Sequence, residues 1–268
     1  MIRIASIPKE KHSLLNEDAI SAFSSGLAVS DGAGGGGLFA ELWSNYLVSN
    51  IPNHPILTWE DLDNWLSSIW ETYYNCCELK AKSMGGLALE KFYDEGSFAT
   101  IAAVWLDKKK HYCHWMSYGD SAVFHYRTNG STLECSIASL DSFNEPPHLI
   151  NCKDTPNIEG FTSGVFKLHR DSVVFVCSDA LSHYALLMYY VENKHKYNDI
   201  IKRCINSHTK NSTIVKTALY SKCGTFKKAF LKLVSSSKNR ANFRRHLSSL
   251  ERKGLLSPDD YSFGYISL

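Results

Sequence analysis

Five short acidic stretches are distributed along the whole chain, and each places one or two carboxylates beside small or polar residues. They span residues 16–18, 30–35, 118–121, 177–180 and 258–262. Apolar runs that should form strands lead directly into two of these stretches, at Asp31 and at Asp179. The strands would therefore bring the acidic stretches together at one edge of a sheet.

Carboxylates gathered at one place repel one another, so a cluster of four or more needs a compensating positive charge. Hard divalent cations such as Mg²⁺ and Mn²⁺, which prefer oxygen ligands, supply that charge best. The pattern therefore predicts a metal site made of carboxylates. The simpler alternative, that aspartate and glycine merely form turns, suits any one stretch but poorly explains all five in this order.

Three other patterns could do chemistry but lack the partners that this chemistry requires. They are the histidines and cysteine of residues 111–114, the glycine run 34–37, and the serines Ser121 and Ser178. A zinc site would need a second Cys/His pair at ligand spacing. The glycine run lacks the Gly-Lys-Ser/Thr ending of a phosphate-binding loop. Neither serine has an evident histidine or a nucleophile elbow.

The composition indicates a globular protein with a substantial core, because 44% of its 268 residues are hydrophobic. No apolar run approaches the length of a membrane-spanning helix, and the first residues lack the long apolar stretch of a secretion signal. We therefore expect a cytoplasmic protein that has no membrane partner. The eight cysteines include no Cys-x-x-Cys pair, so reduced thiols are expected.

Basic residues are concentrated near the carboxyl terminus. Residues 227–253 contain nine Lys or Arg against the single acid Glu251, so this segment carries +8 and the rest of the chain about −6. A solvated basic helix face is the favoured interpretation, with contact to nucleic acid or an acidic protein surface as the alternative. The expected buried stripe consists of Phe230, Leu231, Val234, Phe243, Leu247 and Leu250.

The first third of the chain must position the first two acidic stretches. Strands are expected over residues 2–7 and 19–29, followed by a glycine-rich turn at 31–37. Apolar residues at steps of three and four from Phe39 to Leu47 predict a helix that packs on the sheet. A second helix should begin at Thr58 as N-cap and end by Gly85.

The rest of the chain alternates between strands and helices. Residues 97–137 predict an antiparallel meander, 140–164 a surface loop, 165–168 and 172–177 strands, 181–253 mostly helix, and 261–268 a final strand. Because acidic stretches come from both ends of the chain, one domain over residues 1–268 is expected. Its class would be α+β, with two antiparallel sheets and helices outside.

In these motifs the sequence resembles the metal-dependent serine/threonine phosphatases of the PPM, or type 2C, family, in the compact form found in bacteria. The resemblance covers almost the full length. Its motifs are Asn16-Glu17-Asp18, Asp31-Gly32-Ala33-Gly34-Gly35, Gly96-Ser97-Phe98-Ala99-Thr100, Gly119-Asp120-Ser121, Ser178-Asp179-Ala180 and Asp259-Asp260-Tyr261-Ser262. Each motif alone is weak, but together and in the family's order they are strong.

The resemblance implies specific roles for the acidic residues. Asp31 would bridge two Mg²⁺ or Mn²⁺ ions, with the carbonyl oxygen of Gly32 as a further ligand. The remaining ligands would be Asp179 and Asp259 on one ion, Glu17 and Asp18 on the other, and Asp120 with Asp179 on a third, weaker ion. Asp260 competes with Asp259 for its place, because adjacent side chains alternate across a strand. The family pattern favours Asp259.

The same resemblance implies a four-layer α-β-β-α sandwich and hydrolysis of phosphoserine and phosphothreonine in proteins. The nucleophile would be a water that bridges the two ions, with Asp31 and Asp179 acting through the bound metal. Two ions about 3.5 to 4 Å apart suit this chemistry, because they neutralise the phosphoryl oxygens and acidify the water. The partner would be a phosphorylated signalling protein, opposing a serine/threonine kinase, and nucleic acid is not favoured.

The sequence departs from the family pattern at the substrate phosphate. Many members carry an Arg four residues before the Glu of the first motif, and this chain has Ser13 there. Lys11 and His12 are the nearest candidates to bind the substrate in its place. Ala33 replaces a histidine found in some members. These departures leave open an alternative, a weak or inactive pseudophosphatase that binds phosphoproteins and regulates.

Overall fold

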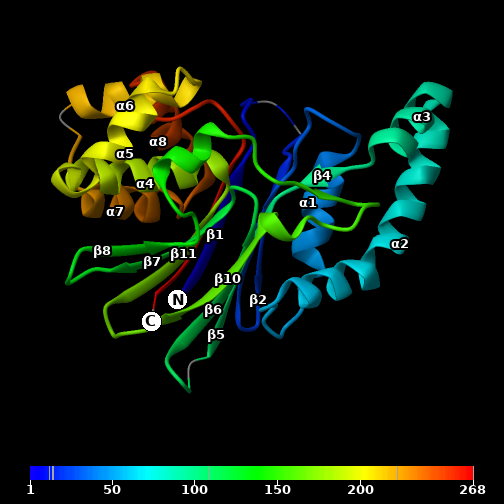
Figure 1. Ribbon diagram of the computed structural model, residues 1–268, viewed down its shortest axis with the longest axis horizontal. Coiled ribbons are helices and arrows are strands. Elements are labelled where there is room, and N and C mark those ends of the chain that lie inside the picture. The colour runs from blue at the N-terminus through cyan, green and yellow to red at the C-terminus, as the bar shows by residue number, and fades with distance from the viewer. Residues whose placement is uncertain (12, 14, 108, 222, 268) are drawn as a thin grey trace.

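The computed structural model describes residues 1–11, 13, 15–107, 109–221 and 223–267, and within them two five-stranded antiparallel sheets lie face to face (Figure 1). The first sheet has the order β1 (Ile2–Ile7), β12 (Tyr261–Ser267), β11 (Ser172–Cys177), β7 (Ala122–Arg127) and β8 (Thr132–Cys135). The second has the order β10 (Phe161–Lys167), β6 (Tyr112–Tyr118), β5 (Ile101–Asp107), β3 (Gly26–Asp31) and β2 (Asp18–Phe23).

Helices cover the outer face of each sheet. Over the first sheet lie α4 (Asp179–Glu192), α5 (Lys194–Asn206), α6 (Lys210–Tyr220), α7 (Phe226–Ser236) and α8 (Arg240–Arg252). Beside the second lie α1 (Ala40–Ser49), α2 (Trp59–Met84) and α3 (Gly86–Glu95). The short elements are β4 (Phe98–Ala99), β9 (Ile150–Asn151) and the 3₁₀ turns η1 (Leu140–Asn144) and η2 (Ile158–Gly160).

Three apolar layers hold this arrangement together. The layer between the sheets is built from small and branched side chains such as Val29, Val104 and Val176. Larger aromatic and aliphatic residues fill the layers under the two helix groups, with Phe175 in one and Trp43 in the other. Strands buried on both faces read as continuous apolar runs rather than as alternating patterns. The predicted four-layer α-β-β-α sandwich of class α+β is thus confirmed.

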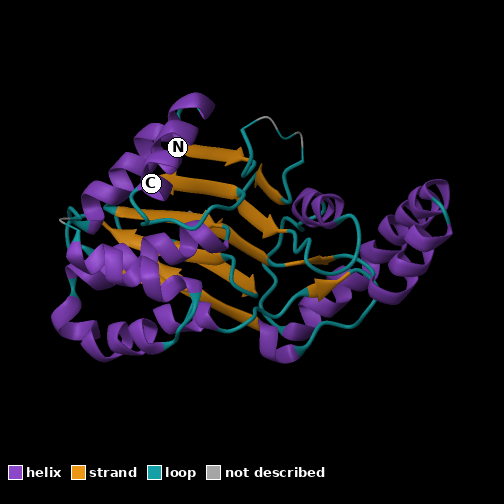
Figure 2. Cartoon of the chain, turned by 90° about the horizontal axis from the view of Figure 1, so that it is seen from above, coloured by secondary structure: helices purple, strands orange, loops and turns teal. Residues whose placement is uncertain are grey.

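The two ends of the chain lie side by side (Figure 2), because β1 pairs antiparallel with β12 and places Ile2 opposite Ile266. The amino group of Met1 donates a hydrogen bond of 2.7 Å to the carbonyl oxygen of Ser267. This pairing places Ile7, the end of β1, opposite Tyr261, which directly follows the last acidic pair.

The predicted helix boundaries in the first third are confirmed. Thr58 caps α2 in a reciprocal box, in which its hydroxyl accepts from the Asp61 amide and the Asp61 carboxylate accepts from the Thr58 amide, both at 3.1 Å. The helix ends at Gly85, whose φ of 110° favours glycine. The chain then enters α3, which the sequence did not predict, and α2 and α3 together form an arm that projects from the sandwich.

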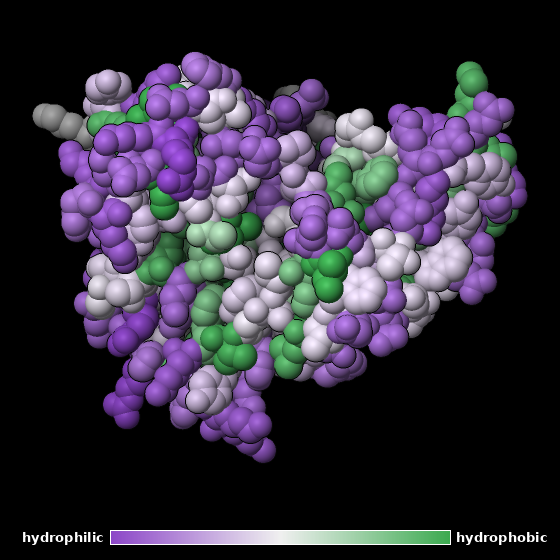
Figure 3. Space-filling view, in the orientation of Figure 1, coloured by the Kyte–Doolittle hydropathy of each residue, from purple (hydrophilic) through white to green (hydrophobic). Residues whose placement is uncertain are grey.

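Apolar side chains are exposed at the far end of this arm (Figure 3). Met84 is 59% exposed and Leu87 is 85% exposed, and both lie where α2 gives way to α3. Among the described residues, no helix combines the length and the apolar character that a bilayer crossing requires.

Two sequence predictions about strands were wrong in connectivity. The single stretch expected over residues 19–29 is a hairpin of β2 and β3. Residues 97–137 are not one meander, because β5 and β6 belong to one sheet while β7 and β8 belong to the other. The turn at Gly119 crosses between the sheets. Since the strands are apolar on both faces, their sequences do not indicate which neighbour each one pairs with.

The basic segment forms two helices rather than one stripe. Phe230, Phe243, Leu247 and Leu250 are buried as predicted, but Leu231 is 51% exposed. The break between α7 and α8 resets the helical phase, so one periodicity does not run through both helices. All eight cysteines are unpaired, as expected for reduced thiols.

Candidate active site

The acidic stretches all lie at the same end of the two sheets. Asp31 ends β3, Asp120 follows β6, and Asp179 follows β11, while Glu17 and Asp259 precede β2 and β12. Antiparallel pairing places the end of β3 beside the start of β2, and the end of β11 beside the start of β12. The topology therefore collects residues from the whole length of the chain at one edge.

Five of the predicted residues with carboxylate side chains line one pocket of about 450 Å³, together with Gly32. They are Glu17, Asp31, Asp120, Asp179 and Asp259. Residues 143–147 and Leu149 line one side of the pocket. The segment predicted to be a surface loop therefore forms one of its walls. Apart from the proline-rich composition of this segment, nothing in the sequence indicated this role.

Asp18 lies behind this pocket and does not line it. It pairs with Asp31 across the β2–β3 ladder, its side chain is 3% exposed, and neither of its carboxylate oxygens has a hydrogen-bond partner among the described residues. Burial raises its pKa well above the ordinary value, the nearby hydroxyl of Ser178 acts against this rise, and the charges of Asp179, Asp260 and Asp259 add to it. A buried carboxylate without a partner is costly, so Asp18 is a candidate to face a cation.

The pocket carboxylates raise one another's pKa values. For Asp31 burial is the main cause, and the charges of Asp18, Asp179, Asp120 and Asp259 follow. Burial, with the charge of Asp179 in second place, raises the pKa of Asp120 to about 7 and that of Asp259 to about 6. Such mutual shifts require that the carboxylates lie close together in a place of low polarity.

The structure separates the two candidates at the start of β12. Asp259 lines the pocket. The carboxylate of Asp260 instead accepts hydrogen bonds from two main-chain amides, that of Lys9 at 2.5 Å and that of Glu17 at 2.6 Å. Asp260 therefore ties Lys9 and Glu17 to the last strand, and this geometry favours Asp259 as the residue that reaches the site.

Glycines let the main chain approach Glu17 closely. The amide of Gly32 donates to the carbonyl oxygen of Glu17 at 3.0 Å. A Cβ atom on Gly32 would stand 2.6 Å from the carbonyl oxygen of Ala40, and one on Gly34 would stand 2.2 Å from Oε1 of Glu17. Any larger residue at either position would displace the main chain or the Glu17 side chain.

Among the described residues one cation lines the pocket, and it is not one that the sequence predicted. Lys11 does not line the pocket, and His12 lies outside the described residues. Lys210, the first residue of α6, is the only Lys or Arg among the described residues of the lining. Its charge acts against burial by lowering the pKa values of Asp120, Asp179 and Asp259.

Hydrogen bonds to the wall of the pocket fix the start of α6. The hydroxyl of Thr209 donates to Oδ1 of Asn144 at 2.9 Å, and Nδ2 of Asn211 donates to the carbonyl oxygen of Phe143 at 2.8 Å. These contacts hold Lys210 beside the acidic residues. No sequence motif indicates this role, because Lys210 lies inside a long helical region, 31 residues from Asp179.

A neutral histidine completes the same wall. His183 is 6% exposed and packs edge-on against Phe143, with the ring centroids 5.4 Å apart. Burial lowers its pKa to about 4, and the nearby charge of Lys210 contributes to the shift. At neutral pH the ring adds no positive charge to the pocket.

The donor set fits hard divalent cations. It consists of carboxylates with the main chain of Gly32, and it includes two buried oxygens of Asp18 that have no partner. No three His, Cys, Asp or Glu side chains in the described part of the chain surround one point closely enough to hold an ion. The fold thus gathers the ligands in one pocket without presetting a complete coordination shell.

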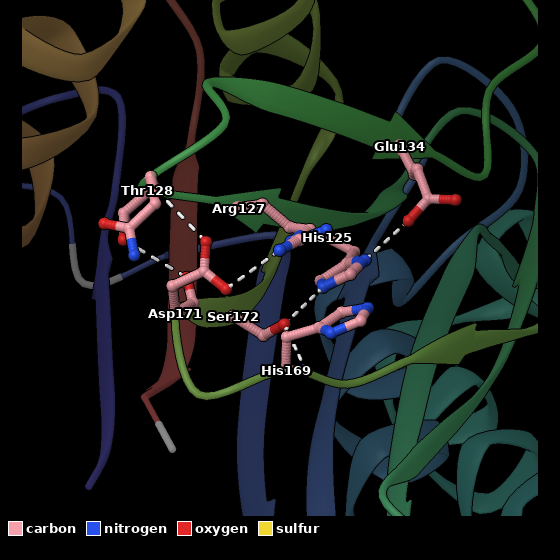
Figure 4. A network of polar contacts seen from close by, with 8 residues as sticks. His125, Arg127, Thr128, Glu134, His169, Asp171 and Ser172 are labelled. Atoms are coloured by element: carbon pink, nitrogen blue, oxygen red, sulfur yellow. Dashed lines mark hydrogen bonds and ion pairs between the residues drawn. The ribbon is translucent and has the colours of Figure 1, made fainter.

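A serine, a histidine and a glutamate form a second polar network away from this pocket (Figure 4). Nδ1 of His125 lies 2.6 Å from Oε2 of Glu134, and its Nε2 lies 2.7 Å from Oγ of Ser172. The arrangement resembles that of a serine nucleophile, but Ser172 is 2% exposed and His125 is 1% exposed. The network joins β7, β8 and β11 and has a structural role.

Neither serine considered from the sequence has a histidine partner among the residues that the structure describes. The hydroxyl of Ser121 contacts Oγ1 of Thr100 at 2.7 Å, and Oγ of Ser178 accepts from the Ser262 amide at 3.1 Å. Both belong to the packing beneath the acidic pocket.

No protein-family model matches the sequence, and no curated protein matches it either. Solved structures do. The catalytic domain of the serine/threonine protein phosphatase PstP in complex with two manganese ions aligns with 99% of this chain and 96% of its own, at 14% identity and a TM-score of 0.52.

Two further structures agree with this match. Mycobacterium tuberculosis PstP/Ppp covers 100% of this chain and 98% of its own at 14% identity and a TM-score of 0.53. Stp1 from Staphylococcus aureus covers 100% and 94% at 14% identity and a TM-score of 0.50. The chain therefore has the fold of the bacterial serine/threonine phosphatases, as its motifs implied.

Proposed function

We propose that this protein is a divalent-cation-dependent phosphatase that hydrolyses phosphoserine and phosphothreonine in proteins. The observation that supports this most is the convergence of five carboxylate residues, drawn from positions 17 to 259, on one pocket. The likeness of the fold to serine/threonine phosphatases of known structure adds support.

The residues fit two principal cations and a third. Asp31 would serve both principal ions, the carbonyl oxygen of Gly32 would be a further ligand, and Asp120 with Asp179 would hold the third ion. Asp179 and Asp259 would complete one ion, and Glu17 and Asp18 the other. Bound there, Mg²⁺ or Mn²⁺ would supply Lewis acidity and positive charge, which lower the pKa of water and offset the charge of the phosphoryl group.

The chain's own residues would bind and orient the phosphate. Lys210 lines the pocket and would contact a phosphoryl oxygen, in the role of the Arg that Ser13 replaces. Residues 143–147 line the pocket and would limit the access of water to a bound phosphate. Neutral His183 shapes this wall without adding charge.

The decisive test replaces Asp31. Asp31→Asn should lower phosphate release from a phosphothreonine peptide in Mn²⁺ at least about 100-fold, because a preorganised charge is lost from the reacting centre. Asp199→Asn, at an exposed position of α5, is the matched control and should retain activity. Equal rates for wild type and Asp31→Asn would contradict the proposal.

The second candidate is a domain that binds phosphoproteins without turnover. Two observations favour it: Ser13 stands where an Arg is expected, and no three ligands of the described set are preset around one point. Purified protein assayed with a generic phosphomonoester and Mn²⁺ separates the candidates. Peptide binding without any phosphate release would support the second and exclude the first.

The eight unpaired cysteines, five of them buried, suit a reducing compartment such as the cytoplasm. There the substrate would be a signalling protein phosphorylated by a serine/threonine kinase.

A further inference from the structure

A second pocket lies between the last two helices and has the opposite charge. It is a groove of about 530 Å³, here called the α7–α8 groove. Its lining consists of Lys232, Ser235 and Ser236 from α7, and Asn242, Arg245, His246, Ser249 and Arg252 from α8. It shares no residue with the acidic pocket.

The α8 residues of the lining occupy one face of the helix. Relative to Asn242 they follow at steps of three, four, seven and ten residues, which places them in a row along the groove. The opposite face of α8 buries Phe243, Leu247 and Leu250 against the sheet. The groove is therefore a solvent-facing feature of a helix that the core holds in place.

The groove carries three permanent positive charges and no acidic side chain. None of Lys232, Arg245 and Arg252 forms an ion pair with a described residue. Arg245 donates to Oδ1 of Asn242 at 3.1 Å, and Arg252 donates to the carbonyl oxygen of Ser248 at 3.2 Å. Each guanidinium has five N–H donors, so both retain donors that can face the groove.

His246 lies among these cations. Its Nε2 atom is buried and has no hydrogen-bond partner within the described residues. Burial lowers its pKa to about 4, and the charges of Lys232 and Lys253 contribute. Because neighbouring cations help to keep this ring neutral, the electrostatic potential around it is positive. A bound anion would reduce that potential.

Hydroxyl and amide groups complete the set of donors. Oγ of Ser235 and of Ser236 donate to carbonyl oxygens of their own helix, at 3.1 and 3.0 Å. A hydroxyl can rotate toward a stronger acceptor. Guanidinium groups, an ammonium group and hydroxyls around a small concave site are the chemistry that recognises phosphate.

We propose that the α7–α8 groove binds a phosphoserine or phosphothreonine side chain of a protein partner. Nucleic acid fits less well, because His246 is the only aromatic ring in the lining and single strands need stacking platforms. If the proposed function holds, a protein with two phosphates could place one here and present the other to the acidic pocket. That tethering would raise the effective concentration of the second phosphate.

The test measures binding of a phosphothreonine peptide to the full chain in the presence of a chelator, where turnover does not occur. The double variant Arg245→Ala/Arg252→Ala should weaken binding at least about tenfold, because it removes charge-assisted hydrogen bonds. The control is Lys238→Ala/Arg240→Ala, which removes the same charge from exposed positions outside the lining. It should leave affinity within about twofold.

A second measurement follows the His246 ring by NMR. Peptide binding should raise the pKa of His246 in the wild type, and inorganic phosphate should do the same more weakly. Equal losses in both double variants, no response of His246, or tighter binding of a single-stranded oligonucleotide than of the peptide would each overturn the proposal. Absence of hydrolysis with Mn²⁺ would instead refute the proposed function and leave peptide binding at the groove unaffected.

Discussion

At the scale of single residues, the charged side chains of the acidic pocket were not equally easy to identify from the sequence. The carboxylates stand in short motifs with glycine and serine, so their types and order were informative. Lys210 stands in no motif, and its role depends on the contacts that place the start of α6 beside η1. The proposed importance of Lys210 follows from its position in the fold and can be tested directly.

Replacing Lys210 should reduce catalytic efficiency toward phosphopeptides. Lys210→Ala is expected to lower kcat/KM about 10- to 100-fold, because the only Lys or Arg in the described lining is lost, and Lys210→Arg should restore most of it. Lys216→Ala, at an exposed position of the same helix, is the control. Steady-state kinetics with Mn²⁺ measure the effect, and an unchanged kcat/KM in Lys210→Ala would rule out the role.

His183 should make the protein sensitive to acid. Its pKa of about 4 in the folded state lies below the ordinary value of about 6.5. Between these values only the unfolded chain takes up the proton, so stability is complete above pH 6.5 and falls as the pH drops toward 4, by about 2–3 kcal/mol. The carboxylates with raised pKa values change the stability with pH in the opposite direction. A variant is therefore needed to isolate the contribution of His183.

The comparison is urea unfolding at pH 7 and pH 4.5. His183→Leu should lose less stability than the wild type between these two values, whereas His195→Leu, at an exposed position of α5, should behave like the wild type. Equal losses in wild type and His183→Leu would show that His183 does not contribute.

At the scale of elements, the edge that carries the site is assembled by pairings between distant strands. β1 pairs with β12 and β3 pairs with β5, and Asp260 accepts hydrogen bonds from the amides of Lys9 and Glu17, which lie between β1 and β2. The sequence identified most of these strands but not their neighbours. It also missed α3 and the crossing of the chain between the sheets at Gly119.

Asp260→Asn should loosen the attachment of Lys9 and Glu17 to the last strand. An amide retains only one acceptor oxygen, so one of the hydrogen bonds from Lys9 and Glu17 is lost, at a cost of about 1–3 kcal/mol in stability. Asp259→Asn should instead weaken Mn²⁺ binding while stability without metal is retained or increased. Calorimetric titration with Mn²⁺ and thermal melts measure the two effects, and a reversed pattern would exchange the roles of Asp259 and Asp260.

At the scale of the whole molecule, the fold holds together a concentration of like charge. Carboxylates from both sheets meet at one edge, where burial and mutual repulsion raise their pKa values. This arrangement costs stability at neutral pH unless cations compensate it. The two oppositely charged pockets, the acidic pocket and the α7–α8 groove, share no lining residue.

Divalent cations should therefore stabilise the native state as a whole. Mn²⁺ at 100 times its Kd should raise the free energy of unfolding by about 2.7 kcal/mol, because it binds the folded chain preferentially. Thermal melts at pH 7 with and without Mn²⁺ provide the measurement, with Asp31→Asn as the comparison. A wild-type Tm that does not respond to Mn²⁺ or Mg²⁺ would contradict the assignment of the pocket as a metal site.

The sequence by itself determined the fold class, most of the regular elements and the acidic residues of the site. It could do so because binary patterns, helix caps and short acidic motifs are local and depend on neighbouring residues in the chain. Thr58 as a helix N-cap and the apolar run before Asp179 as a strand illustrate this, since fewer than ten residues are enough to predict each.

Only the tertiary structure decided which strands pair, which of Asp259 and Asp260 faces the pocket, and which cation stands beside the carboxylates. These outcomes depend on contacts between residues far apart in the chain, such as that between Glu17 and Asp260. The grouping of Lys232, Arg245 and Arg252 in one groove likewise follows from packing, because the sequence shows a basic segment but not which of its side chains share a face of the fold.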